Sequence, residues 1–187
     1  MRNQIHVIFA IFVAIALSLV TVNVVYAHLY SGYRWQSSSV LWYIGGGNAP
    51  IPSSWHSPFR AAASTWTSAP GSFALSEVSP VNALANLGAK YFSQDPNIPD
   101  AAHGFSFAYT QGGYIVAASS YLNRDYTNWV TNGSAFPDVR TVATHELGHW
   151  VRYIDSCSAP TSIMCAQAVV KWNLTAHDKN ELVAVYP

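Results

Sequence analysis

The sequence has 187 residues, of which 50% are hydrophobic, 14% aromatic and only 10% charged. Soluble domains carry about 25% charged residues, so this chain is unusually poor in charge. Nine basic and nine acidic residues leave a formal net charge of zero, which excludes a protein that depends on phosphate contacts with nucleic acid. Low charge and many aromatic residues also exclude intrinsic disorder. The composition therefore predicts one compact domain with a substantial core.

The N-terminal segment has the features of a secretory signal. Arg2 supplies a positive charge before the apolar stretch 7–20, and residues 25–27 offer small side chains at the two positions that a signal peptidase reads. We therefore expect residues 1–27 to be removed and residues 28–187 to be secreted as a single domain. An uncleaved anchor is the alternative, because the apolar segment is just long enough to span a bilayer. After cleavage we expect no stable association with a membrane.

The remaining chain alternates between strand and helix patterns. Alternating apolar residues bounded by glycine or proline predict strands, and segments rich in alanine or begun by proline predict helices. Strands followed by interspersed helices predict an α/β (α+β) domain with one mixed sheet. The expected strands cover residues 40–44, 73–78, 104–109 and 114–122, and the expected helices cover 54–66, 137 to about 153, and a last segment that begins with a Thr175–Asp178 capping box.

The second expected helix contains the sequence His-Glu-x-x-His. His145 and His149 are four residues apart, so both imidazoles lie on one helix face and can bind one zinc ion. Glu146 lies on the flank, where its carboxylate can take a proton from water without binding the ion. Zinc lowers the pKa of a bound water toward ~7, and a general base then assists attack on a carbonyl. The spacing predicts a catalytic zinc site with Glu146 as general base.

The motif and the residues after it resemble the metzincin zinc metallopeptidases. Asp155 falls at the position of their third ligand, as in the snapalysin-like variant, and Met164 matches the methionine turn that lies beneath the metal. The resemblance covers most of residues 33–187. It implies a matrixin-like catalytic domain with a mixed twisted sheet, an active-site helix and a C-terminal helix. It also implies one catalytic zinc ion held by His145, His149 and Asp155.

The resemblance further implies what the protein acts on. A protein or peptide substrate would pair as an added antiparallel strand with an edge strand within residues 104–122. Residues 165–172 would form a wall of the pocket for the side chain after the scissile bond. We expect a monomeric zinc endopeptidase. The alternative is a non-catalytic, zinc-containing extracellular domain that binds a partner, but such a domain would need no base at Glu146.

Two features depart from the metzincin pattern. Arg152 stands where the family has a glycine that lets the chain turn sharply after the helix. Glu181 therefore stays open as an alternative third ligand, although reach and the methionine turn favour Asp155. The acidic loops with which matrixins bind calcium are not evident, so the presence of structural calcium stays open.

The two cysteines of the sequence lie near the expected metal site. Seven residues separate Cys157 from Cys165, and such a pair in an exported protein predicts a disulfide. The disulfide would stiffen the segment between Asp155 and Met164 and contribute about 2–3 kcal/mol to stability. Two free buried thiols are the alternative.

Overall fold

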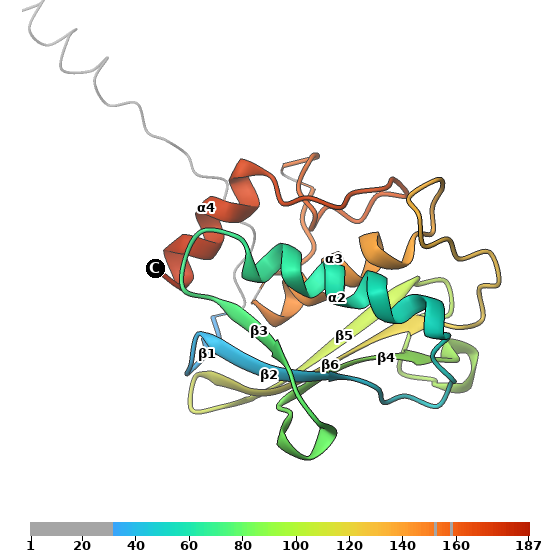
Figure 1. Ribbon diagram of the computed structural model, residues 1–187, viewed down its shortest axis with the longest axis horizontal. Coiled ribbons are helices and arrows are strands. Elements are labelled where there is room, and N and C mark those ends of the chain that lie inside the picture. Colours follow the sequence, from blue (N-terminus) through green and yellow to red (C-terminus); the bar gives the residue numbers. More distant parts are fainter. Residues whose placement is uncertain (1–31, 152, 158) are drawn as a thin grey trace, which may run out of the picture.

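The computed structural model describes residues 32–151, 153–157 and 159–187. Over these residues the protein is a mixed α/β structure in which α2 and α3 lie on the same face of a mostly parallel sheet (Figure 1). The strands are β1 Arg34–Trp35, β2 Ser39–Ile44, β3 Ala74–Glu77, β4 Ala85–Lys90, β5 Gly104–Gln111 and β6 Tyr114–Asn123. The helices are α2 Ser53–Thr67, α3 Val139–Trp150 and α4 Ala176–Val185, with short 3-10 turns at Pro80–Asn82 and Phe92–Gln94.

The sheet places β5 at an edge. The strand order is β1-β6-β4-β2-β3, in which β1 and β4 pair with different parts of β6, and β5 pairs with β6 outside this order. All pairs are parallel except β5 and β6, which are antiparallel, with Gly104 opposite Leu122 and Gln111 opposite Tyr114. Within the described part of the chain no strand pairs with the other side of β5, so main-chain groups along this edge are left without a ladder partner.

All four expected strands are confirmed to within two residues at each end, whereas the two-residue β1 was not expected and neither was β4. Its sequence, Ala-Asn-Leu-Gly-Ala-Lys, has no β-branched or aromatic residue and therefore lacks the usual strand signal. Its place in the sheet explains the composition. The carbonyl oxygens of Gly45 and Gly46 pass so close to Gly88 that a Cβ there would lie 2.4 and 2.5 Å from them. Small residues in β4 thus allow a loop to pack directly on its backbone.

The helices begin where the sequence predicts. Asp138 caps α3, because its carboxylate accepts a hydrogen bond from the Thr141 amide at 2.8 Å. The capping box of Thr175 and Asp178 at the start of α4 is also present. However, α3 ends at Trp150 and not near residue 153. The Tyr153 amide bonds back to the Gly148 carbonyl, so the chain turns away from the helix axis at that point.

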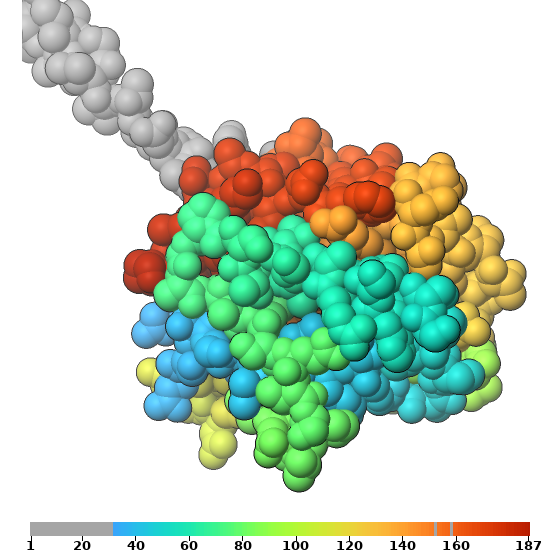
Figure 2. Space-filling model, in the orientation of Figure 1, coloured from blue at the N-terminus to red at the C-terminus, as the bar shows by residue number. Residues whose placement is uncertain are grey.

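One contiguous core joins the sheet to all three helices and contains residues from Trp35 to Tyr186. The indole N–H groups of Trp35 and Trp66 donate to the carbonyls of Trp150 and Thr144 at 2.7 and 2.9 Å, which satisfies these polar groups inside the core. The space-filling view shows little of α3, because α2 covers it from that side (Figure 2). The helices of the described residues are all too short or too polar to cross a membrane.

Candidate metal centre

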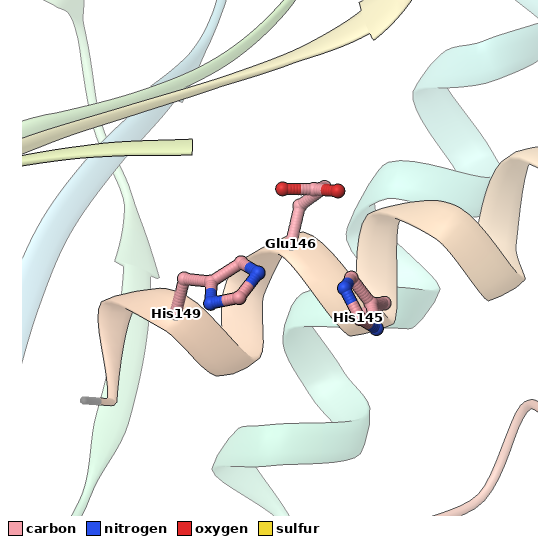
Figure 3. Close-up of side chains that lie close together, drawn as sticks. All are labelled: His145, Glu146 and His149. Carbon is pink, nitrogen blue, oxygen red and sulfur yellow. The ribbon is translucent and has the colours of Figure 1, made fainter. Parts of the chain in front are cut away.

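Three side chains of α3 come together as a group that could hold a metal ion. One potential ligand atom from each of His145, Glu146 and His149 lies within 4.8 Å of the others. The two imidazoles project side by side from the helix, and Glu146 points toward the strands (Figure 3). This arrangement follows from the four-residue spacing, which the helix converts into one shared face.

Both imidazoles are held by hydrogen bonds on the nitrogen that faces away from the group. His145 Nδ1 lies 2.9 Å from the carbonyl oxygen of Ile163, and His149 Nδ1 lies 2.8 Å from the carbonyl oxygen of Tyr153. A carbonyl only accepts, so each Nδ1 carries the hydrogen and Nε2 is the nitrogen left to bind an ion. Bonds of this kind fix the ring orientation of metal-binding histidines.

Asp155 reaches both imidazoles from the segment after α3. Its Oδ1 lies 2.9 Å from His145 Nε2 and 3.6 Å from His149 Nε2. Burial by itself lowers the pKa of His145, but the hydrogen bond with Asp155 and the charges of Glu146 and Asp155 outweigh it and raise that pKa to about 9. The two carboxylates therefore stabilise positive charge on the His145 ring.

The structure separates the two candidates for the third ligand. Asp155 contacts the histidine pair, whereas Glu181 lies on α4 with its Oε1 3.3 Å from His177 Nε2. Glu181 also does not line the pocket beside the histidines. Arg152, which stands where the metzincin pattern has a glycine, lies outside the described residues. Asp155 remains the predicted third ligand on this geometry.

Met164 lies buried directly beneath α3. A Cβ on Gly148 would lie 2.2 Å from the Met164 sulfur, so a larger residue at position 148 would force the buried methionine side chain to shift. The segment around Met164 is anchored to α4, since the carboxylate of Asp178 accepts hydrogen bonds from the Ser162 hydroxyl and the Ile163 amide. Met164 thus lies beneath the helix that carries the histidines, and the assignment of a methionine turn stays a prediction.

A disulfide and one lysine side chain also hold the segment around Met164. The predicted disulfide joins Cys157 to Cys165. The Lys171 ammonium donates to the carbonyls of Pro160, Ser162 and Cys165 at 3.1, 2.8 and 3.3 Å. A single cation thus holds three main-chain carbonyls of the segment in place, and it does so from one wall of the pocket.

A pocket of about 730 Å³ opens over the histidine pair. Its walls come from β5, from α3 and from the residues after the methionine turn, and most of the side chains that line it are apolar. Its charged lining residues other than the histidines are Glu146, Asp155 and Lys171. The Lys171 ammonium is already bonded to main-chain carbonyls. The pocket therefore offers a bound molecule a mainly apolar surface, and its charged and imidazole groups are clustered around the histidine pair.

The residues that hold Glu146 were not predicted from the sequence. The hydroxyl of Ser106 on β5 donates to Glu146 Oε2 at 2.6 Å, and the hydroxyl of Ser120 on β6 lies 2.6 Å from that of Ser106. Ser120 is fully buried and in turn accepts from the Trp150 indole at 2.7 Å. The sequence signal that could have revealed these residues is the presence of a serine on each of β5 and β6 at a position that faces α3. A buried hydroxyl needs a hydrogen-bond partner.

The sequence matches no protein-family model and no curated protein sequence. A relation to the metzincins therefore stays a prediction, and it depends on His145, Glu146, His149, Asp155 and Met164. What the structure adds is their arrangement. Four of them converge on one pocket, and the fifth lies directly beneath the helix that carries the histidines.

Proposed function

We propose that this chain is a secreted zinc-dependent endopeptidase. The observation that carries the proposal is the convergence of His145, His149 and Asp155 at the side of a large pocket, with the carboxylate of Glu146 beside them. Two imidazole nitrogens and one carboxylate oxygen are a donor set that zinc accepts in catalytic sites, where the fourth position stays open. The orientation of both rings by main-chain carbonyls supports this fit.

A bound zinc ion supplies Lewis-acid chemistry, because it lowers the pKa of a water molecule and polarises a carbonyl oxygen. Glu146 does the proton transfer. Glu146 is 4% exposed, and its carboxylate lies within 4.8 Å of the two histidine donors. In the proposed reaction Glu146 takes a proton from the attacking water and passes it to the nitrogen of the departing amine. Because the carboxylate returns to its ionised form, each turnover consumes one water molecule and no other reagent.

The substrate is proposed to be an extended peptide. The outer edge of β5 offers main-chain donors and acceptors, and five successive residues of this strand from Gly104 to Ala108 line the pocket. A peptide can therefore add to the sheet as an antiparallel strand. Residues 165–169 and Lys171 line the pocket after the methionine turn. We assign this segment as the wall for the side chain that follows the scissile bond.

The non-catalytic alternative fits the site less well. A structural zinc ion is normally enclosed by four protein ligands, whereas these three donors face a pocket and the side chain of Asp155 is 59% exposed. Secretion is supported by the disulfide between Cys157 and Cys165, because disulfides persist in oxidising compartments. The expected signal sequence, residues 1–27, lies outside the described residues.

The test compares metal binding with hydrolysis on protein that starts at His28. The wild type should bind one zinc ion per chain and cleave an unstructured protein in a chelator-sensitive manner. Glu146→Gln should keep the zinc but lose activity by about 10²–10⁴-fold, because it removes the general base without removing a ligand. Zinc content is measured by atomic absorption and cleavage by the release of new amino termini.

A matched control is Glu77→Gln. Glu77 lies on β3 and forms an ion pair with Arg60, so its neutralisation changes the same charge without touching the pocket. Its activity should equal that of the wild type. If the wild type binds zinc and cleaves no unstructured protein, the non-catalytic alternative is correct; if it binds no zinc, the metal centre itself is wrong.

A further inference from the structure

The carboxylate of Glu146 ends a chain of hydrogen bonds that starts from its own helix and passes through two strands. The Trp150 indole on α3 bonds to Ser120 on β6 at 2.7 Å, Ser120 bonds to Ser106 on β5 at 2.6 Å, and Ser106 bonds to Glu146 Oε2 at 2.6 Å. We call these four side chains the Ser106 relay. Ser106 and Ser120 are direct cross-strand partners in the β5–β6 register.

The two ends of the relay fix the direction of every bond in it. An indole N–H can only donate, so Ser120 is an acceptor toward Trp150. The Ser106 hydroxyl lies 2.6 Å from Glu146 Oε2 and 3.2 Å from the main-chain carbonyl oxygen of Glu146. Both oxygens can only accept, so Ser106 must donate its one hydrogen to Glu146, and the shorter distance favours Oε2. Ser106 therefore receives the hydrogen of Ser120, and the bonds all run from the indole toward the carboxylate. Hydrogen bonds aligned in this way polarise one another and strengthen the last bond of the chain.

Gly104 shapes the other side of the same carboxylate. A Cβ at this position would lie 2.4 Å from Glu146 Oε1 and 2.8 Å from its Cγ and Cδ. The carboxylate therefore occupies space that only a glycine leaves open at the start of β5. Oε2 is held by the hydroxyl of Ser106, and Oε1 lies against the backbone of Gly104, which also lines the pocket.

We propose that the Ser106 relay is a positioning device that holds Glu146 in one orientation and leaves Oε1 as the oxygen that accepts the proton. With Oε2 engaged as an acceptor from Ser106, a proton taken up by the carboxylate resides on Oε1, and the bond from Ser106 persists throughout the cycle. Ser106 is thus a positioning residue that acts through Glu146. This inference deepens the proposed function and rests on it for its catalytic consequence.

The test compares Ser106→Ala with Ser119→Ala. Ser119 is the neighbour of Ser120 on β6, and its hydroxyl bonds to Asn86 at 2.7 Å, so its removal also costs one hydrogen bond of the sheet but leaves the relay intact. Ser106→Ala should lower kcat by about 10- to 100-fold, the range found when an outer partner of an active-site group is removed. KM and zinc affinity should match those of Ser119→Ala.

Ser106→Thr provides the rescue, because threonine keeps a hydroxyl on the same carbon and suits a strand. It should restore most of the lost kcat. Equal kcat for Ser106→Ala and Ser119→Ala would overturn the proposal. So would a kcat for Ser106→Thr as low as that of Ser106→Ala, in protein that folds and binds zinc like the wild type.

A crystallographic measurement decides the positioning role even if the protein is not a peptidase. Structures of the zinc-loaded wild type and of Ser106→Ala should show Glu146 Oε2 bonded to Ser106 in the first and the carboxylate rotated or spread over several orientations in the second. An unchanged Glu146 side chain in Ser106→Ala would refute the inference. Absence of hydrolysis by the wild type would refute only the proposed function.

Discussion

At the scale of single residues, the contact of Asp155 with both imidazoles predicts a large effect on metal binding. Asp155→Ala removes one of three donors, so we expect the zinc affinity to fall by at least about 10- to 100-fold. Competition with a chromophoric chelator measures the affinity. Glu181→Ala serves as the comparison, because Glu181 is paired with His177 away from the pocket. An affinity that falls for Glu181→Ala and not for Asp155→Ala would reverse the assignment of the third ligand.

The metal-binding role of a residue could be predicted from the sequence where the spacing of the residues alone implies it. His145 and His149 share a helix face in any helix, so their pairing needed no knowledge of the fold. The bonds of Ser106 and Ser120 could not be predicted in the same way, because they depend on the register between β5 and β6. The contact of Asp155 with the histidines was expected only through the resemblance to the metzincins. The contact of Gly104 with Glu146 was not expected, since the chain must first turn and pack before it forms.

At the scale of elements, the close approach of α3 to the methionine turn predicts an unusual response to alanine. Alanine in a helix interior is usually more favourable than glycine by about 1 kcal/mol. Gly148→Ala should nevertheless destabilise the protein by about 1–3 kcal/mol, because its methyl group overlaps the buried sulfur of Met164. Denaturant unfolding measures the change. In the double variant Gly148→Ala/Met164→Ala, the changes in unfolding free energy of the two single variants should not add. Simple additivity would show that the contact between residue 148 and Met164 does not cause the destabilisation.

The disulfide joins the segment that begins with Asp155 to the methionine turn, so its loss should affect both stability and the metal centre. Replacing Cys157 and Cys165 together by serine opens the loop of seven residues between them. We expect a loss of about 2–3 kcal/mol of unfolding free energy and weaker zinc binding, measured by calorimetry on the same preparation. Unchanged zinc affinity would show that Lys171 and Asp178 alone hold this segment.

Element boundaries were predictable where capping or turn residues mark them. Asp138 and Thr175 each accept the hydrogen bond that their sequence context implies. The predicted end of α3, near residue 153, was wrong. The apolar pattern of the helix continues beyond Trp150, but in the structure the carbonyl of Tyr153 bonds to the His149 ring. The strand β4 was not predicted because its small residues have a low strand propensity. They are suited instead to the close packing of a neighbouring loop on the strand.

At the scale of the whole molecule, the size of the core predicts that the fold does not depend on the metal. The core joins the sheet and all three helices, so removal of zinc by a chelator should leave the far-ultraviolet circular dichroism unchanged. At a zinc concentration 100 times Kd, binding stabilises the folded state by about 2.7 kcal/mol. The thermal midpoint should therefore fall by about 5–10 °C on chelation. Collapse of the dichroism signal would instead show that the ion is needed for folding.

The reversed direction of β5 gives the proposed cleft a polarity. The strand begins at Gly104, against Glu146, and runs away to Gln111 at the β5–β6 hairpin. An antiparallel peptide would therefore pass Gln111 with its amino-terminal half and reach the wall at residues 165–169 with its carboxyl-terminal half. After cleavage, the fragment that carries the new carboxylate would still be paired along β5. The fragment that carries the new amine would be held only at the wall, so the two products would leave by opposite ends and in a fixed order.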